Sequence, residues 1–415
     1  MFFALRGENF DGNSYAAKAL ELGCSYVVID NPCYAVEGDE RVLLVEDSLK
    51  ALQQMARRHR RQLGTPIVGI TGTNGKTTTK ELVATVLAKK YHILYTQGNL
   101  NNHIGVPLTL LGLTREHEMA IVEMGANHPG DIKELVDIAL PNFGLITNVG
   151  KAHLLGFGSF EGVKATKGEL YDYLRRTADK AFINVDNPHL CQMASERNMQ
   201  HDPERPESLL IQYGLEYQGG KVLPSSAEHP FLRVEVDGVV INTNLVGTYN
   251  ADNVMAALAV GRQFGVSFEE AVKAIEAYSP SNNRSQMTKT SRNTLIVDAY
   301  NANPTSMAAA LENFSNVSAD CKVAMLGDML ELGKESAEEH ATVIRAVQNH
   351  TLSAVYFVGK EFAAASEAVP YGKNIHFFPT SDALAEHLAT LNLTGATILI
   401  KGSRGTRMEK VIPVL

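Results

Sequence analysis

Short apolar runs alternate with helical patterns along most of the chain. The first series of predicted strands comprises "PIVGI", "HILYT", "MAIVEMG", "GLITNV" and "AFINV", between residues 66 and 185. A second series begins at residue 294 and comprises "TLIVDAY", "KVAMLG", "AVYFVG", "NIHFF" and "TILIKG". Strands rich in branched apolar residues that alternate with helices are typical of α/β domains with largely parallel sheets. The pattern therefore predicts two such domains, the second of them doubly wound.

Three local signals interrupt or punctuate this rhythm. In "FLRVEVDGVVINTNLV", Asp237-Gly238 stands between alternating apolar residues and predicts a β-hairpin. Ser267 and Glu270 have the spacing of a capping box and predict the start of a helix. The turn-forming residues of Tyr278–Asn283 predict a linker.

A smaller unit precedes the first series of strands, with a helix-like "SYAAKALELG" followed by a strand-like "SYVVID". The basic stretch Ala56–Pro66 closes the next helix. A charge run of this kind predicts a solvated helix end, and here it also marks a domain boundary. We therefore expect three domains, with the ranges 1–62, 63–279 and 280–415.

Composition is that of a globular protein. The chain has 415 residues, 45% of them hydrophobic and 20% charged, which is enough for more than one core. The formal net charge of −8 argues against a nonspecific binder of nucleic acid or anionic membrane. The sequence lacks an apolar run of the roughly 20 residues that a membrane helix needs, and "MFFALRGENFDG" does not have the pattern of a signal peptide. We expect a cytoplasmic protein without membrane insertion, whose scattered cysteines are reduced core thiols: Cys24, Cys33, Cys191 and Cys321.

The stretch "IVGITGTNGKTTTK" predicts a phosphate-binding loop between a strand and a helix. Free backbone N–H groups and the positive end of the helix face an anion in this arrangement. Gly72 and Gly75 permit close approach, Lys76 neutralises phosphate charge, and the Thr77 hydroxyl can reach Mg²⁺. The standard GxxxxGK[ST] pattern would have a further glycine where this chain has Ile70, so the loop is a variant. We predict that it binds the phosphates of a nucleotide.

Glu123 ends the predicted strand "MAIVEMG". Ligands of α/β sheets bind at the carboxyl ends of the strands, and Mg²⁺ prefers oxygen ligands with few protein contacts. Thr77 and Glu123 are therefore candidate metal ligands. The alternative for Glu123 is a carboxylate that caps a helix or serves a loop.

The phrase "GTNGKTT" resembles the ATP loop of the Mur ligase superfamily, which contains cell-wall amino-acid ligases and folylpolyglutamate synthase. The resemblance covers nearly the whole chain and implies an α/β protein of three domains: a small N-terminal UDP-sugar domain, a central P-loop ATPase domain and a C-terminal Rossmann-like domain. The last four of the following phrases together resemble the branch of the superfamily that adds D-alanyl-D-alanine. In chain order the phrases are "FFALRGENFDG", "GNLNNHIGVP", "VEMGANHPGDI", "NVGKAHLLGFGSFEGVKATKGEL", "VGTYNADNVMAA", "DAYNANPTSM", "LGDMLELGKES" and "KGSRGTRME".

This resemblance implies an ATP-dependent amide ligase of cytoplasmic peptidoglycan precursor synthesis. The γ-phosphoryl group of ATP would pass to a carboxylate, and an amine would attack the resulting acyl phosphate, with release of ADP and phosphate. Such a reaction depends on positioning and charge neutralisation. The implied cofactors are ATP and Mg²⁺, and the implied partners are UDP-N-acetylmuramoyl-tripeptide and D-alanyl-D-alanine, with no nucleic acid and a monomeric enzyme.

The resemblance also implies roles for residues whose own sequence pattern does not decide their function. His153 matches a ligand of a second Mg²⁺, although a lone histidine after a strand is more often a packing residue. Lys167 matches a lysine carried as a carbamate, whereas its plain interpretation is a solvated helix lysine. The nucleotide set is Gly72, Thr73, Asn74, Gly75, Lys76, Thr77, Thr78, Asn250 and Asn253 near adenine, Arg284 near phosphate and Asp298 near ribose. The substrate set is Arg6, Asp11, Asn99, Asn101, Asn102, Asn301, Asn303 and Asp328.

Two departures from the family pattern stand beside these matches. We expect a further stretch before "FFALRG", with a TDSR-like uridine motif, and the family's Gly-Arg at the second linker is Asn283-Arg284 here. The nearest alternative is the ligase that adds a single amino acid, but its DNPR-like loop is absent from the sequence. Folylpolyglutamate synthase would lack "FFALRGENFDG". A nucleotide-binding protein without ligase activity is the alternative from another functional class.

Overall fold

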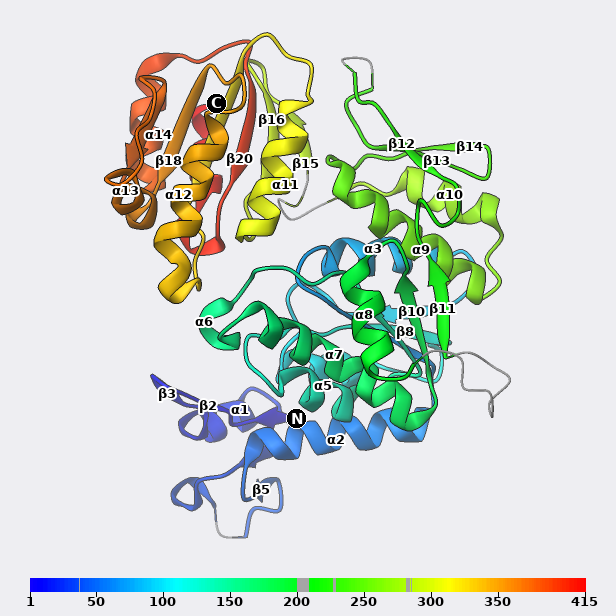
Figure 1. Ribbon diagram of the computed structural model, residues 1–415. Helices are drawn as coiled ribbons and strands as arrows, with labels where there is room; N and C mark the ends of the chain where they lie inside the picture. Colours follow the sequence, from blue (N-terminus) through cyan, green and yellow to red (C-terminus); the bar gives the residue numbers. More distant parts are fainter. Residues whose placement is uncertain (37, 200–208, 227–228, 281–283, 285) are drawn as a thin grey trace.

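Three units follow one another along the chain, and Figure 1 shows them as the blue, cyan-to-green and yellow-to-red parts of the ribbon. The N-terminus lies in the blue unit beside the central one, and the C-terminus lies in the unit at the opposite end. The computed structural model describes residues 1–36, 38–199, 209–226, 229–280, 284 and 286–415.

The N-terminal unit is a small parallel sheet in the order β1-β4-β5, with one short helix packed on it. Its core contains Ala16 and Ala19 from the helix and Val27 and Ile29 from the central strand. The predicted helix and strand both occur in this unit. The elements are β1 (Phe2–Phe3), β2 (Arg6–Gly7), β3 (Phe10–Asp11), η1 (Gly12–Tyr15), α1 (Ala16–Glu21), β4 (Val27–Ile29), η2 (Pro32–Tyr34) and β5 (Val42–Leu44).

Helix α2 (Ser48–Leu63) joins this unit to the next one. The Asp47 side chain caps its first turn, and Gly64 ends it in the left-handed conformation, at φ 68°. The prediction that its basic end is solvated is wrong for Arg60, which is only 5% exposed. The Arg60 guanidinium donates to the Ala139 carbonyl and the Asn142 side chain, because α2 packs against the central unit.

The central sheet has six parallel strands in the order β11-β10-β9-β6-β8-β7. All five predicted strands occur, and β11 is an addition that the sequence did not indicate. Strand β6 lies between β9 and β8, with Ile70 opposite Glu123. The carboxyl ends of these strands therefore bring the phosphate loop and Glu123 to one edge. The strands are β6 (Ile67–Thr71), β7 (Ile93–Tyr95), β8 (Met119–Glu123), β9 (Phe143–Ile146), β10 (Lys180–Asn184) and β11 (Leu210–Tyr213).

Helices cover both faces of this sheet, and α9 packs along α3 (Figure 1). The capping box is confirmed at Ser267 and Glu270. The helices are α3 (Lys76–Leu87), α4 (Gly105–Leu111), α5 (Asp131–Ala139), α6 (Leu154–Phe157), α7 (Phe160–Thr177), α8 (Pro188–Glu196), η3 (Thr248–Asn250), α9 (Ala251–Gln263) and α10 (Phe268–Ala277).

The predicted hairpin is confirmed as β13 (Arg233–Val236) and β14 (Val239–Asn242). Asp237 and Gly238 both have positive φ, at 51° and 75°, as a two-residue hairpin turn requires. A third strand, β12 (Lys221–Leu223), pairs with β13 and extends the hairpin to an antiparallel sheet.

The C-terminal unit contains a six-stranded sheet in the order β15-β16-β20-β17-β18-β19. The five predicted strands are parallel, and β15 joins the edge antiparallel, which the sequence did not indicate. Part of the predicted linker, residues 281–283, lies outside the described residues. The elements are β15 (Gln286–Lys289), β16 (Thr294–Asp298), α11 (Pro304–Ser315), β17 (Lys322–Gly327), η4 (Gly333–Glu335), α12 (Ser336–Val347), β18 (Ala354–Val358), α13 (Lys360–Ser366), β19 (Ile375–Phe378), α14 (Ser381–Leu391), β20 (Thr397–Lys401), η5 (Arg404–Thr406) and η6 (Met408–Val414).

Two sequence expectations concern the chain as a whole. Within the described part of the chain, no helix combines the length and apolar character needed to cross a membrane. All four cysteines are described and free. Three are half-buried and pack against the cores, but Cys33 is exposed, so the prediction of core thiols is wrong for Cys33. Cys191 lies in α8 and Cys33 in η2, whereas Cys24 and Cys321 lie in connecting segments.

Candidate active site

The phosphate loop has the backbone geometry of an anion site. Gly75 precedes α3 at φ 79°, and no side chain caps the first turn of this helix. A Cβ on Gly75 would lie 2.7 Å from Oδ1 of Asn253, and a Cβ on Gly72 would lie 2.0 Å from Oγ1 of Thr147. Both positions therefore require glycine, and the N–H groups at the start of the helix are left for a ligand.

Replacing Gly75 with Ala should reduce the free energy of ATP binding by more than it reduces the free energy of unfolding. The positive φ alone costs about 1–2 kcal/mol for an L-residue, and the collision with Asn253 must in addition shift the loop. Gly64→Ala is the matched control, because Gly64 also has positive φ but has no neighbouring atom within 4 Å of an added Cβ. Nucleotide titration and thermal unfolding of both variants make the comparison. Equal ATP affinity in the two variants would contradict the assignment of the loop.

Lys76 folds back over the loop that precedes it. Its Nζ donates to the carbonyl oxygens of Gly72 and Thr73, at 2.8 and 2.9 Å. Burial lowers the pKa of Lys76 to about 8, an effect that the Glu123 carboxylate opposes and Arg284 reinforces. An anion at the loop would stabilise the charged form of this lysine.

The rest of the loop is held by the segment after β9. The Thr73 hydroxyl accepts from the Gly150 N–H at 3.0 Å, and the Thr147 hydroxyl donates to the Asn74 carbonyl at 2.6 Å. From the C-terminal unit, the Asn303 side chain donates to Oδ1 of Asn74 at 2.8 Å. Thr78 is buried in α3 and does not extend this network. The loop is thus fixed from two units of the chain.

Glu123 is buried where β8 ends, beside the first turn of α3. Its Oε1 accepts from the Thr77 hydroxyl at 3.2 Å and from the Asn101 side chain at 2.8 Å. Its Oε2 has no hydrogen-bond partner, and the ammonium of Lys80 lies 3.9 Å from it. A buried carboxylate oxygen without a donor beside a hydroxyl fits a small divalent cation, so the predicted proximity of Thr77 and Glu123 is present.

The described residues contain no cluster of three or more histidine, cysteine or acidic side chains that could hold a metal by themselves. Mg²⁺ commonly takes one or two protein ligands and completes its shell with water and phosphate oxygens. The pair Thr77 and Glu123 is therefore sufficient on the protein side for a cation that binds together with a nucleotide.

His153 and Lys167 approach the same place from the segment after β9 and from α7. Lys167 is 2% exposed, its Nζ donates to the Ala126 carbonyl at 3.4 Å, and it lies 5.4 Å from the Phe157 ring centre. Burial holds the pKa of Lys167 well below its usual value, and the charge of Lys76 adds to this. Burial also lowers the pKa of His153, against the opposing Glu331 carboxylate. Lys167 is thus a buried amine, and its alternative interpretation as a solvated helix lysine is wrong.

Two asparagines predicted near adenine lie inside the central unit. The Asn253 side chain donates to Oδ1 of Asn250 at 2.8 Å and accepts from the Thr79 hydroxyl at 2.9 Å. The Asn250 side chain donates to the Val246 carbonyl. These bonds tie α9 to α3 directly behind Gly75. A contact of either amide with adenine stays a prediction.

Arg284 and Asp298 come from the start of the C-terminal unit. The Arg284 guanidinium lies 3.6 Å from the centre of the Tyr300 ring, and Arg404 lies 5.4 Å from the same ring. The buried Lys401 ammonium pairs with the Asp298 carboxylate. The positive charge of Arg284 contributes to lowering the pKa of Lys76 in the phosphate loop.

The other predicted residues of the C-terminal unit have different roles: some hold its own loops and helices in place, and one contacts the central unit. Asn303 caps α11 as well as binding Asn74. Asn301 is exposed. Both Asp328 oxygens accept from backbone N–H groups at the start of α13, and the side chain is 3% exposed. Asp328 therefore anchors the loop that follows β17, and that loop carries Glu331 to His153.

The polar residues after β7 have separate roles in this structure. Asn101 contacts Glu123, as described above. Oδ1 of Asn102 accepts from the N–H groups of Ile104 and Gly105 at the start of α4. Asn99 is exposed. All three asparagines were predicted to bind substrate. Of the three, only Asn101 contacts the candidate metal ligand Glu123 in the structure.

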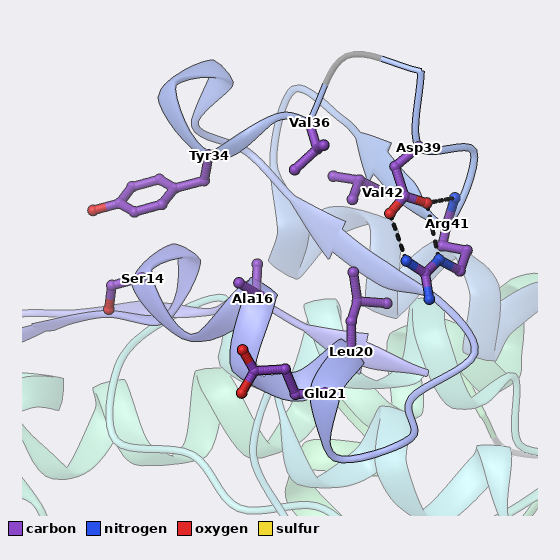
Figure 2. A pocket seen from close by; sticks show the side chains of 10 residues that line it. Ser14, Ala16, Leu20, Glu21, Tyr34, Val36, Asp39, Arg41 and Val42 are labelled. Carbon is purple, nitrogen blue, oxygen red and sulfur yellow. Dashed lines mark hydrogen bonds and ion pairs between the residues drawn. The ribbon is translucent and has the colours of Figure 1, made fainter.

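The N-terminal candidates, Arg6 and Asp11, lie away from the phosphate loop. Arg6 donates to Asp30 at 2.8 Å, and Asp11 accepts from the backbone and side chain of Asn13, which lowers the pKa of Asp11. A cavity of about 460 Å³ opens between α1 and the segment around β5 in this unit (Figure 2). Its lining includes neither Arg6 nor Asp11 but is formed by Ser14, Ala16, Ala17, Leu20, Glu21, Tyr34, Val36, Asp39, Arg41 and Val42.

Sequence reasoning missed four residues of the site. Lys80 and Lys401 are buried cations beside carboxylates, the Tyr300 ring lies next to two arginines, and Glu331 contacts His153 across the units. Lys80 had one usable signal, because it stands four residues after Lys76 and so falls on the same helix face. Glu331 had none, since its left-handed φ of 64° and its partner both depend on the folded loop.

Comparison with known proteins agrees with this geometry. The family model of the Mur ligase middle domain matches residues 70–261, and that of the Mur ligase glutamate ligase domain matches residues 283–404. The UDP-N-acetylmuramoyl-tripeptide–D-alanyl-D-alanine ligase of Bacillus subtilis is 33% identical over 99% of this chain and 89% of its own length.

Solved structures give the same result. The structure of MurF from Acinetobacter baumannii has a TM-score of 0.86 at 30% identity, covering 99% of this chain and 89% of that one. MurF from Thermotoga maritima in complex with ADP has a TM-score of 0.84 at 26% identity, covering 99% and 92%. On this likeness over nearly its whole length, the chain belongs to the Mur ligase family, in the branch of the UDP-N-acetylmuramoyl-tripeptide–D-alanyl-D-alanine ligases.

Proposed function

We propose that this chain joins D-alanyl-D-alanine to UDP-N-acetylmuramoyl-tripeptide with cleavage of ATP to ADP and phosphate. The observation that carries the proposal is the geometry of the phosphate loop, where the Thr77 hydroxyl donates to the buried Glu123 carboxylate and the Lys76 ammonium lies over the loop carbonyls. The charge of Lys76 also lowers the pKa of both His153 and Lys167. The full-length likeness to ligases of that name supplies the substrates. The proposed division of labour follows residues 1–62 for the UDP-sugar part, 63–279 for ATP and 280–415 for the dipeptide and closure.

The phosphate loop would position ATP for the first step. The backbone N–H groups at the start of α3 and the Lys76 ammonium would hold the β- and γ-phosphates. A terminal carboxylate oxygen of the tripeptide attacks the γ-phosphorus, ADP leaves, and an acyl phosphate results. Arg284, close enough to affect the Lys76 pKa, would neutralise charge that develops on the phosphates.

Thr77 and Glu123 would hold Mg²⁺ through the hydroxyl and the carboxylate, and His153 and carbamylated Lys167 would serve as ligands for a second Mg²⁺. Mg²⁺ there would neutralise charge on the phosphate oxygens. Lys167 is suited to carry a carbamate, because burial favours its neutral amine, and that amine can add CO₂ with loss of a proton. The modified side chain would offer an anionic oxygen in place of a cation.

The C-terminal unit would bring the acceptor to the acyl phosphate. The contacts that hold it against the central unit include Asn303 on Asn74 of the loop, Glu331 on His153, and the Lys151 ammonium on Glu339 at 2.6 Å. The amine of D-alanyl-D-alanine attacks the carbonyl carbon, and phosphate leaves with the bridging oxygen. Closure of this kind excludes water from the acyl phosphate.

The test is phosphate release from MgATP across a matrix of substrates. The donors are UDP-N-acetylmuramoyl-tripeptides that end in lysine or in diaminopimelate, and the acceptors are D-alanyl-D-alanine, D-alanine or none. We expect release that requires a tripeptide and the dipeptide, with an amide product found by mass. Release with a single amino acid on a shorter donor would favour the alternative ligase. ATP binding without turnover on any pair would favour a nucleotide-binding protein.

A further inference from the structure

Lys80 is a buried cation next to the candidate metal ligand, and the reaction described above does not use it. It lies on α3 one turn after Lys76 and is 1% exposed. Its Nζ lies 3.9 Å from Oε2 of Glu123 and 3.8 Å from Oε1 of Glu81. The ring centre of Tyr95 is 5.7 Å away.

The two oxygens of Glu123 have different surroundings. Oε1 receives the hydroxyl of Thr77 and the amide of Asn101. Oε2 receives no hydrogen bond, and the charge of Lys80 is what faces it. A buried carboxylate without a partner is costly, so a cation at this distance stabilises it when no metal is bound.

Apart from Glu81, whose Oε1 lies 3.8 Å from Nζ of Lys80, the other charges that act on this pair are positive. Lys76 interacts electrostatically with Glu123. The positive charge of Arg284 acts on both Lys76 and Lys80. Glu123 and Glu81 favour the charged form of Lys80, whereas burial opposes it. A free divalent cation at Glu123 would therefore meet repulsion, which the negative charge of a triphosphate would offset.

We propose that Lys80 is a built-in counter-cation of Glu123 that opposes binding of a free divalent cation and makes metal binding depend on nucleotide. The inference rests on the proposed function, because it takes Glu123 as a ligand of the divalent cation. Lys80 is a positioning residue here: it acts through the carboxylate and touches neither the nucleotide nor the reacting carbonyl. The metal would then enter the site together with ATP.

The test uses Mn²⁺ alone as the probe, on the full chain without nucleotide. Mn²⁺ titration followed by electron paramagnetic resonance should show binding at least about tenfold tighter in Lys80→Met than in the wild type, because a unit charge a few ångströms away is removed. Mn²⁺ should also raise the Tm of Lys80→Met more than that of the wild type. Lys80→Arg keeps the charge and should behave as the wild type does.

Lys164→Met is the matched control, since Lys164 is also a buried lysine beside a glutamate, 3.1 Å from Glu161, but on another helix. It should leave Mn²⁺ affinity unchanged. If Lys80→Met is unstable, the double variant Lys80→Met/Glu123→Gln should recover Tm, because both charges are then gone. Equal or weaker Mn²⁺ binding in Lys80→Met, with an equal shift of Tm, would overturn the inference.

The metal site itself is tested separately with Mn²⁺ and a non-hydrolysable ATP analogue. Glu123→Gln should weaken that nucleotide-dependent binding whatever Lys80 does. If Glu123→Gln has no effect, the proposed metal site fails. If it weakens binding but Lys80→Met binds free Mn²⁺ as the wild type does, the counter-cation role alone fails.

Discussion

Lys76→Met should lower the rate of ATP-dependent ligation by at least about a thousandfold, because it removes the ammonium held over the phosphate loop, which in the proposed function neutralises the transferred phosphoryl group. The variant should keep the Tm of the wild type. Burial already lowers the pKa of Lys76 to about 8, which means that the folded protein disfavours its charge, and methionine has a similar length. The measurement is the steady-state rate at saturating substrates, together with the Tm of both proteins.

The control for this variant is Lys89→Met, at an exposed lysine just after the end of α3. Its rate should stay within about twofold of the wild type, since an exposed charge at this distance is screened by solvent. A rate for Lys76→Met within tenfold of the wild type, in a folded protein, would remove Lys76 from the reaction.

Glu123→Gln is the second change for which we expect a large effect. The rate at a fixed low Mg²⁺ concentration should fall by about a hundredfold or more, since the only charged oxygens beside Thr77 among the described contacts are lost. The glutamine oxygen can still accept from Thr77 and Asn101, so the backbone at the end of β8 should keep its place. Initial rates over a range of Mg²⁺ concentrations separate a loss of metal affinity from a loss of turnover.

Glu118→Gln offers a close comparison, because Glu118 is exposed just before the other end of the same strand, where it accepts from the His92 N–H. It should show the Mg²⁺ dependence of the wild type. An unchanged Mg²⁺ dependence in Glu123→Gln as well would place the metal ligand elsewhere.

The phosphate loop could be predicted because all of its signals are local. Strand, glycines, lysine and helix follow one another within fifteen residues of "PIVGITGTNGKTTTK", and the parallel sheet then places Glu123 beside Thr77. The order of strands along the chain also predicted the α/β class. Strands β11 ("LIQY") and β15 ("QMTK") were missed because they are short and contain polar residues, so their apolar pattern is weak.

Contacts between distant segments could not be predicted in this way. Glu331 and His153 are 178 residues apart and meet only because two units pack together. Asp328 has the appearance of a ligand-binding residue in the sequence, yet the start of α13 takes both of its oxygens. Lys80 resembles an ordinary helix lysine until the fold buries it beside Glu123. Residue type and spacing indicate what a side chain can do, while burial decides what it faces.

The central claim is that a carboxylate is activated by phosphorylation at the loop that contains Lys76. The most direct measurement uses UDP-N-acetylmuramoyl-tripeptide labelled with ¹⁸O in its terminal carboxylate, together with D-alanyl-D-alanine and unlabelled ATP. Because phosphate leaves with the oxygen that attacked the γ-phosphorus, the account predicts one ¹⁸O in each released phosphate and one retained in the new amide. Phosphate without ¹⁸O, formed along with the amide, would contradict it.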